Sequence, residues 1–103
     1  GTAENLTGGY MGEEFEIDQM YPVYLNVAEF QEEKEAARTF GWALAAEKIH
    51  ASLFHQAHDA AAAGKDLDID SIFICTVCGH TAPESAPQFC PVCGARKEAY
   101  KEF

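Results

Sequence analysis

One stretch decides the fold of this chain: AARTFGWALAAEKIHASLFHQAHDAA, residues 36–61. In steps of four and three it returns to small or aromatic side chains, which predicts one apolar face of a long helix, expected from Glu33 to about Ala63. Two successive positions of this face differ, because Glu47 brings a carboxylate and His50 an imidazole. The complete face consists of Ala36, Phe40, Ala43, Glu47, His50, Phe54, Ala57 and Ala61.

Glu47 and His50 are three residues apart, so both side chains project from the same side of the helix, one turn from each other. An unpaired charge buried in such a face costs several kcal/mol or loses its charge through a shifted pKa. A bound metal ion between facing helices would compensate that cost. On this pattern alone, a hydrogen-bonded polar layer that fixes helix register is the simpler interpretation.

A second apolar stripe precedes this helix and also contains acids. Glu13 lies within the stripe, and Glu16 follows it by one turn. Pro22 falls inside the predicted helix, where it is expected to kink or locally widen a turn while the stripe keeps its phase on both sides. A polar turn at residues 30–33 then leads into the long helix, which Gly64 is expected to end as a C-cap. The stripe consists of Leu6, Tyr10, Glu13, Ile17, Met20, Tyr24 and Val27.

Composition narrows the class of protein. The 103 residues suffice for one ordinary domain, or for a small domain and a fragment of another. The formal charge of −10 argues against a nucleic-acid partner and against an anionic membrane surface. No apolar run approaches the length of a membrane span. Paired cysteines suit a reducing compartment, so a cytoplasmic location is expected.

The last third of the chain carries two C-x-x-C-G sequences, with Cys75 and Cys78 in the first and Cys90 and Cys93 in the second. Each is typical of a metal knuckle, in which glycine at the fifth position permits the left-handed backbone of the turn. Four thiolates predict a tetrahedral site for Zn or Fe. The segment between the pairs, residues 79–89, is shorter than the usual zinc spacing, which leaves the metal open.

Other residues of this third have simpler interpretations. A short strand is expected at residues 72–74, and His80 is expected at the surface. The aromatic residues either cover the metal or form an ordinary small core; they are Phe73, Phe89, Tyr100 and Phe103. The chain is thus predicted to be mainly helical with a small β metal-knuckle domain. The predicted division is a helical hairpin at 1–64, an acidic linker at 65–71 and a knuckle domain at 72–103.

Taken together, these motifs resemble rubrerythrin, in the ferritin-like group of di-iron proteins. The resemblance extends over nearly the whole chain, and the conjunction of motifs is more specific than any one of them. The matching sequences are GEEFE at 12–16, MYP at 20–22, AEKIH at 46–50, ICTVCG at 74–79 and CPVCGA at 90–95.

The resemblance implies a role for each candidate residue. Glu47 would bridge two irons, and His50 and Glu13 would be terminal ligands of one of them. Glu16 would be a terminal carboxylate on the other iron. One rubredoxin-type iron, an electron relay, would be held by Cys75, Cys78, Cys90 and Cys93. The implied enzyme is a peroxidase that reduces hydrogen peroxide to water and acts against oxidative stress.

The chain departs from the family pattern in having only one helix of each kind, whereas a ferritin-like site takes a Glu from two helices and a Glu-x-x-His from two more. It therefore resembles the second helix pair of such a bundle, followed by the rubredoxin-like domain. Completion requires a homo-oligomer, at least a dimer, or a chain carrying the first helix pair. The resemblance further implies an electron donor such as rubredoxin or an NAD(P)H-dependent rubredoxin reductase.

Two alternatives remain open. The chain is an electron-transfer or iron-binding module without catalysis if the di-iron site is not built. It is a zinc-ribbon interaction protein if the acids and His50 serve only as a polar helix face. Iron content separates them: more than one iron per chain fits the peroxidase, about one fits the carrier, and zinc without iron fits the ribbon.

Overall fold

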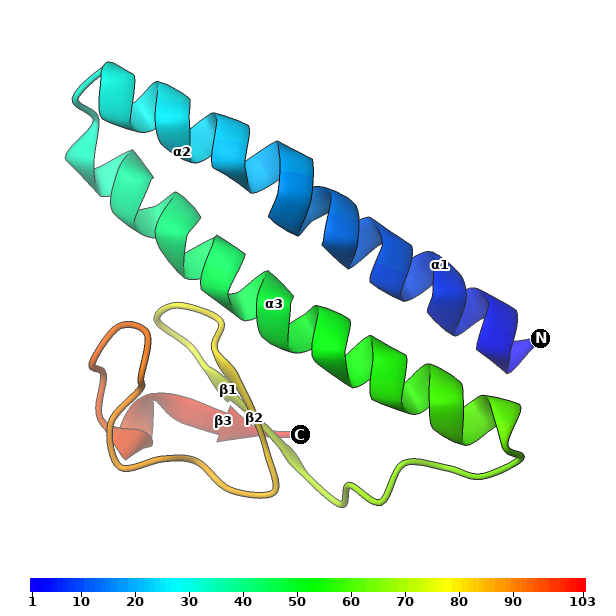
Figure 1. Cartoon of the computed structure of the whole chain (residues 1–103). Helices are drawn as coiled ribbons and strands as arrows, with labels where there is room; N and C mark the ends of the chain where they lie inside the picture. The colour runs from blue at the N-terminus through cyan, green and yellow to red at the C-terminus, as the bar shows by residue number, and fades with distance from the viewer.

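The computed structural model describes residues 1–103 as an antiparallel helical hairpin with a small three-stranded domain beside its second arm (Figure 1). The first arm is continuous from end to end, and the second is a single long helix. The elements are α1 (Thr2–Phe15), η1 (Glu16–Met20), α2 (Tyr21–Phe30), α3 (Lys34–Ala62), β1 (Ile72–Cys75), β2 (Thr81–Pro83), η2 (Lys97–Ala99) and β3 (Tyr100–Glu102). This arrangement confirms the predicted mainly helical fold with a small β domain.

Ring contacts and histidine–carboxylate contacts join the two arms of the hairpin. The ring of Tyr10 on α1 stacks on His55 of α3 with centroids 4.1 Å apart. The imidazole of His55 also lies 2.8 Å from the carboxylate of Glu14. Nearer the turn, Tyr21 and Tyr24 pack on Phe40. These contacts hold the acidic residues of the first arm opposite the Glu47 and His50 region of α3.

The turn of helix before Pro22 is widened. Residues Glu16–Met20 form a π-helix, in which the N–H of Tyr21 bonds the carbonyl of Glu16. A π turn inserts an extra residue, so it shifts the phase of the helix that follows. The prediction of a locally widened turn is confirmed, but the prediction of constant phase is wrong. Ala28, outside the expected stripe, is the buried residue of α2, whereas Val27 is 48% exposed.

The two ends of α3 follow local rules. Glu33 is the N-cap, so the helix begins one residue later than predicted. Glu32 reverses the chain with φ of 58°. At the other end the N–H of Gly64 bonds the carbonyl of Ala61, and its φ of 70° is the left-handed conformation expected of a C-cap glycine.

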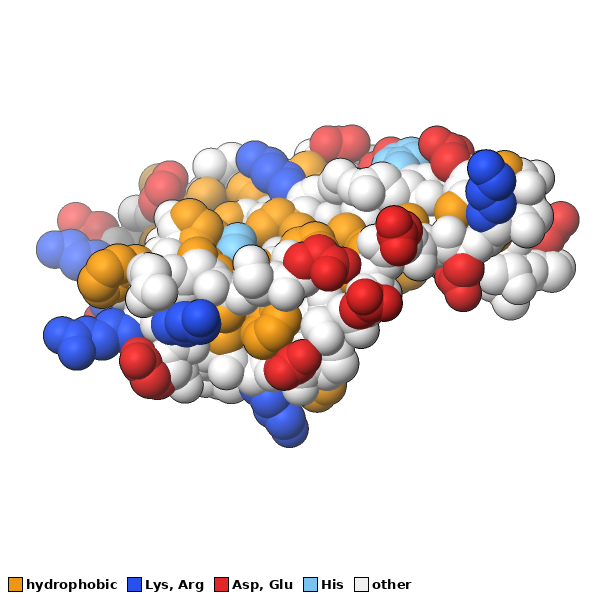
Figure 2. Space-filling view, turned by 90° about the horizontal axis from the view of Figure 1, so that it is seen from below, with side chains coloured by type: hydrophobic (Ala, Val, Ile, Leu, Met, Phe, Trp, Pro, Cys, Tyr) orange, Lys and Arg blue, Asp and Glu red, His pale blue; other side chains and the backbone are white.

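The helical hairpin forms a layer one helix thick. The molecule measures 49 × 32 × 14 Å, and only seven of its residues are buried. Large apolar side chains stay exposed on the first arm, among them Met11 at 59% and Phe15 at 52%. Seen from below, hydrophobic side chains show mainly in the left and centre of the molecule, and acidic side chains are spread over the whole face (Figure 2). One layer cannot cover both faces of its helices.

The small domain is an antiparallel sheet in the order β2-β1-β3. It lies beside α3, on the side away from α1 and α2 (Figure 1). The contact is close, because Gly79 stands next to the Cβ of Ala46, which is only 5% exposed. Gly79 has φ of 84°, as the knuckle turn requires. No helix combines the length and the apolar character needed to cross a bilayer.

Candidate metal centres

Three of the predicted ligands meet where α1 and α3 face each other. The Nδ1 atom of His50 lies 3.1 Å from Oε2 of Glu47 and 3.9 Å from Oε2 of Glu13. One potential ligand atom from each residue lies within 4.8 Å of the other two. The three side chains are largely covered, with Glu13 and Glu47 each 16% exposed and His50 32%. The spacing suits a cation shared by two carboxylates and an imidazole.

The carboxylate of Glu13 is the least satisfied group of this cluster. Its Oε2 atom is buried and accepts no hydrogen bond. Burial, followed by the neighbouring carboxylates of Glu47 and Glu16, raises the pKa of Glu13 to about 8. Such a group needs either a proton or a cation, since a bare buried charge beside like charges is unfavourable. The donor set therefore fits a hard or borderline metal ion such as iron.

Glu16 lies near this cluster but outside its closest group. It begins the π-helix, and its charge and hydrogen bonding contribute to the raised pKa of Glu13. Turns of this kind are frequent at functional sites because they redirect a side chain. Tyr21 ends the same turn, and burial together with the charges of Glu47 and Glu16 raises the pKa of its phenol. Tyr21 was not among the predicted site residues, and the Met-Tyr-Pro sequence was the signal for it.

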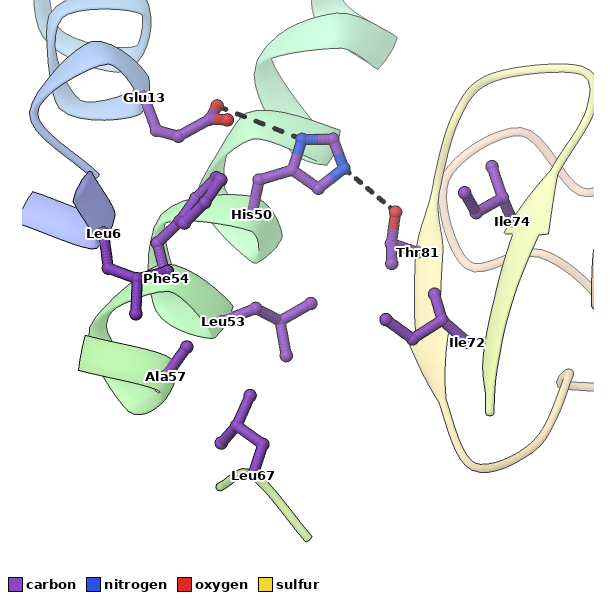
Figure 3. A pocket seen from close by; sticks show the side chains of 10 residues that line it. All are labelled: Leu6, Glu13, His50, Leu53, Phe54, Ala57, Leu67, Ile72, Ile74 and Thr81. Atoms are coloured by element: carbon purple, nitrogen blue, oxygen red, sulfur yellow. Dashed lines mark hydrogen bonds and ion pairs between the residues drawn. The ribbon is translucent and has the colours of Figure 1, made fainter. Parts of the chain in front are cut away.

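An apolar pocket of about 440 Å³ opens beside the cluster. Glu13 and His50 stand at one end of it, and Thr81 of the small domain faces the imidazole from the other side (Figure 3). Leu53 and Phe54 come from α3, and Ile72 comes from β1. The pocket is thus built by both parts of the chain and gives the polar groups an apolar wall.

The four cysteines form the second candidate centre. The Sγ atoms of Cys75 and Cys93 are 3.7 Å apart, and those of Cys78 and Cys90 are 3.5 Å apart. Both separations far exceed a disulfide bond. A tetrahedral ion with metal–sulfur distances of about 2.3 Å would place its sulfurs about 3.8 Å apart, so the thiolates fit a single ion. In each knuckle a glycine N–H bonds the carbonyl of the first cysteine, Gly79 to Cys75 and Gly94 to Cys90.

Hydrogen bonds tune the thiol of Cys90. Burial opposes ionisation of Cys90, but hydrogen bonds from Tyr100 and from backbone N–H groups lower the pKa of its thiol to about 6. Tyr100 also lies 2.7 Å from Nδ1 of His80. His80 is buried, so the prediction of a surface position is wrong, because strand β3 covers it with Tyr100. Phe89 and Phe103 are each 64% exposed and belong to neither a cover nor a core.

Comparison with known proteins finds separate matches for the helical part of the chain and for the small domain. A family model described as Rubrerythrin matches residues 1–58. The chain belongs to the rubrerythrin family. A second model, described as the rubredoxin-like domain of rubrerythrin, matches residues 73–101. The resemblance inferred from sequence motifs is therefore confirmed.

Individual relatives agree with the family models. Rubrerythrin-2 of Clostridium acetobutylicum is 52% identical over 100 residues, which is 97% of this chain and 54% of that protein. Nigerythrin of Nitratidesulfovibrio vulgaris is 28% identical, over 96% of this chain and 48% of that protein. The solved structure of fully reduced, all-ferrous nigerythrin superposes with a TM-score of 0.85, covering 98% of this chain and 48% of that one. The chain thus spans about half the length of these relatives.

Membership of the rubrerythrin family sets the metal chemistry of both centres. The helical part belongs to a ferritin-like di-iron family, and the small part is a rubredoxin-like domain with a cluster of four cysteines. The structure brings together Glu13, Glu47 and His50 of the four predicted di-iron ligands, with Glu16 nearby. Their individual assignments to one iron or the other stay predictions.

Proposed function

We propose that this chain forms part of a non-haem di-iron peroxidase of the rubrerythrin type, which reduces hydrogen peroxide to water. One observation carries the proposal: a buried Glu13 oxygen without a hydrogen-bond partner faces the imidazole of His50 and the carboxylate of Glu47. This is the environment of a metal ligand set rather than of a structural polar layer, in which every buried oxygen would be bonded.

The reaction consumes two electrons and two protons for each peroxide molecule. Bound iron supplies Lewis acidity and a change of oxidation state. Glu13, Glu47 and His50 would hold the metal at this cluster, and Glu16 would be a carboxylate ligand of the second iron. Leu53 and Phe54 line the adjoining pocket and limit access of bulk water to the site. Electrons would arrive through the thiolate-bound iron of the small domain.

The proposed enzyme needs a second helical hairpin. A four-helix di-iron site takes ligands from four helices, and this chain supplies one helix with Glu13 and one with Glu47 and His50. The 14 Å thickness of the molecule and its exposed apolar side chains support a partner layer. The partner is either another copy in a homo-oligomer, at least a dimer, or a chain or segment that carries the first helix pair.

Exposed apolar side chains at the cysteine knuckles are the basis for the proposed electron donor. Val77 lies within the first cysteine knuckle and is 53% exposed, and Phe89 directly precedes the second knuckle and is 64% exposed. Such an exposed apolar surface suits docking of a small redox protein such as rubredoxin or of an NAD(P)H-dependent rubredoxin reductase. The thiolate site favours a reducing compartment, and we place the protein in the cytoplasm.

A second function is favoured by a specific observation. All four thiolates of the four-cysteine site come from one chain, whereas the helical site has only part of its ligands. A chain without a partner layer would therefore bind one iron and act as an electron carrier without catalysis of its own.

Iron content, mass in solution and peroxide consumption separate these functions. Anaerobically purified, iron-reconstituted protein is measured beside Glu47→Gln, with Glu14→Gln as the matched control because Glu14 is 48% exposed and pairs with His55. A peroxidase gives more than one iron per chain, a bleachable thiolate-to-iron band, a dimer or larger species, and peroxide consumption that only Glu47→Gln abolishes. One iron per chain and no peroxide consumption would leave the electron carrier.

A further inference from the structure

The imidazole of His50 is held from both sides. Its Nδ1 atom faces the carboxylates of Glu47 and Glu13, and its Nε2 atom lies 2.9 Å from Oγ1 of Thr81 (Figure 3). Thr81 is the first residue of β2 and is only 6% exposed. A buried side chain of the small domain is thus the sole protein partner of the ring nitrogen that points away from the carboxylates.

Proton accounting assigns the roles in this contact. The Thr81 hydroxyl carries one proton, and it donates that proton to the carbonyl of Gly79 at 3.2 Å. A hydroxyl that donates to Gly79 can only accept from His50, and in that arrangement the proton of the 2.9 Å contact belongs to Nε2. The lone pair of Nδ1 is left for a cation among the carboxylates.

Resting on the di-iron site proposed above, we propose that Thr81 is a positioning residue for His50. By accepting the Nε2–H bond it keeps the proton on Nε2 and presents Nδ1 to the metal. Metal-binding histidines commonly have their second nitrogen fixed in this way, and loss of such a partner lowers metal affinity. The helical metal site is therefore oriented by the rubredoxin-like domain of the same chain.

The small domain holds Thr81 firmly enough for this role. Thr81 pairs with Ile74 in the sheet, and the neighbouring carbonyl of His80 accepts the N–H of Cys75. Gly79 rests against Ala46, one turn of α3 before His50. The hydroxyl is therefore fixed by the sheet, by the first knuckle and by the contact with α3.

Thr81→Val tests the proposal, because it keeps the β-branched shape and removes the hydroxyl. Thr81→Ser restores the hydroxyl, and Thr76→Val is the matched control, since Thr76 is an exposed residue that bonds only the Ala99 carbonyl. Each protein is labelled with ¹⁵N-histidine, loaded with zinc at the four-cysteine site, and examined by long-range ¹H–¹⁵N NMR. The spectrum of His50→Gln identifies the His50 signals.

We expect a protonated Nε2 on His50, protected from exchange with water, in wild type, Thr81→Ser and Thr76→Val. In Thr81→Val this proton is expected to lose its protection. An unprotonated Nε2 in the wild type, or the same protection in Thr81→Val, would overturn the proposal. This measurement needs no metal at the helical site, so it judges Thr81 even if the di-iron assignment fails.

Affinity for Co²⁺ added to the zinc-loaded protein provides the second measurement. Thr81→Val is expected to weaken binding at the helical site about 10- to 100-fold, whereas Thr81→Ser and Thr76→Val stay close to wild type. Equal affinity in wild type and Thr81→Val would refute the positioning role. Absence of any Co²⁺ binding that depends on Glu47 would instead count against the di-iron function, with the NMR result standing separately.

Discussion

Gly9 on α1 stands directly opposite the ring of Phe54 on α3: a Cβ atom at residue 9 would lie 2.7 Å from Cε1 of Phe54. One helical turn further along each arm, Glu13 stands opposite His50. The two pairs follow the same antiparallel register, since each arm advances by four residues between them. The close approach at Gly9 therefore sets the helix separation at which the carboxylate and the imidazole share a site.

Gly9→Ala should push the arms apart at this point. Replacing glycine by alanine favours a helix by about 1 kcal/mol, but overpacking against a ring costs about 1–3 kcal/mol. We expect a net loss of unfolding free energy and weaker Co²⁺ binding at the helical site, measured by urea denaturation and by titration. Gly8→Ala is the control, because nothing lies within 4 Å of a Cβ at Gly8, and it should stabilise the protein. Equal effects of the two substitutions would contradict this account.

Glu13 should make metal-free protein less stable as the pH rises. Its pKa is about 8 in the folded chain against an ordinary value of 4.5, so the folded state retains a proton that the unfolded state has lost. The stabilising effect of that proton is complete below about pH 4.5 and is lost as the pH rises through about 8. Unfolding free energies of protein with an empty helical site, measured across this range, should fall less in Glu13→Gln than in wild type.

Metal uptake should be linked to the same proton. Below about pH 8 a cation must displace the proton of Glu13, so Co²⁺ affinity should increase from pH 6 to pH 8 and proton release should accompany binding. Release is measured by titrating weakly buffered protein with an indicator dye. Glu14→Gln should behave as wild type, because Glu14 lies outside the cluster. Binding without proton release at pH 6.5 would show that Glu13 is already ionised in the folded chain.

Emptying the four-cysteine site should weaken the helical site. The sheet and knuckles are held by a metal whose binding contributes on the order of 10 kcal/mol in small structural sites, and they position Thr81 against His50. Chelation, or Cys75→Ser with Cys78→Ser, should unfold the small domain and lower Co²⁺ affinity at Glu47 about tenfold or more. Returning zinc to chelated protein is the control and should restore the affinity. An unchanged affinity would show that the two sites are independent.

Ala46→Leu should separate the small domain from α3. Ala46 is 5% exposed, and its Cβ lies 3.9 Å from a Cβ built at Gly79. A longer side chain here overpacks a contact between two backbones and should cost about 1–3 kcal/mol. We expect loss of the protected Nε2–H of His50, as in Thr81→Val. Ala62→Leu, at the exposed end of α3, should leave that proton protected.

The sequence was informative wherever one periodicity or one motif fixed the outcome. The stripe through Phe40 and Phe54 predicted α3 to within a residue at each end, because a buried face must recur every 3.6 residues. The paired cysteines predicted the knuckles, because glycine at the fifth position permits the turn that brings two thiolates together. The placement of Glu47 and His50 one turn apart followed from the same helical geometry.

Packing between distant segments was beyond the reach of these rules. The π turn at Glu16 altered the burial of Val27 and Ala28, because an inserted residue cannot be seen in a stripe that assumes constant phase. His80 is buried under Tyr100, which lies twenty positions away in sequence, and this contact depends on the pairing of β1 with β3.

By itself, the sequence determined the elements and the ligand types: two amphipathic arms with acids in their faces, Glu47 and His50 on one turn, and four thiolates in two knuckles. Only the tertiary structure decided that Glu13 faces His50 across the hairpin and that Thr81 bonds the far side of the same ring. The physical reason is the separation in sequence over which each effect acts. Backbone periodicity acts between neighbours in the chain, whereas these contacts join residues 37 and 31 positions apart, whose meeting depends on how whole elements pack.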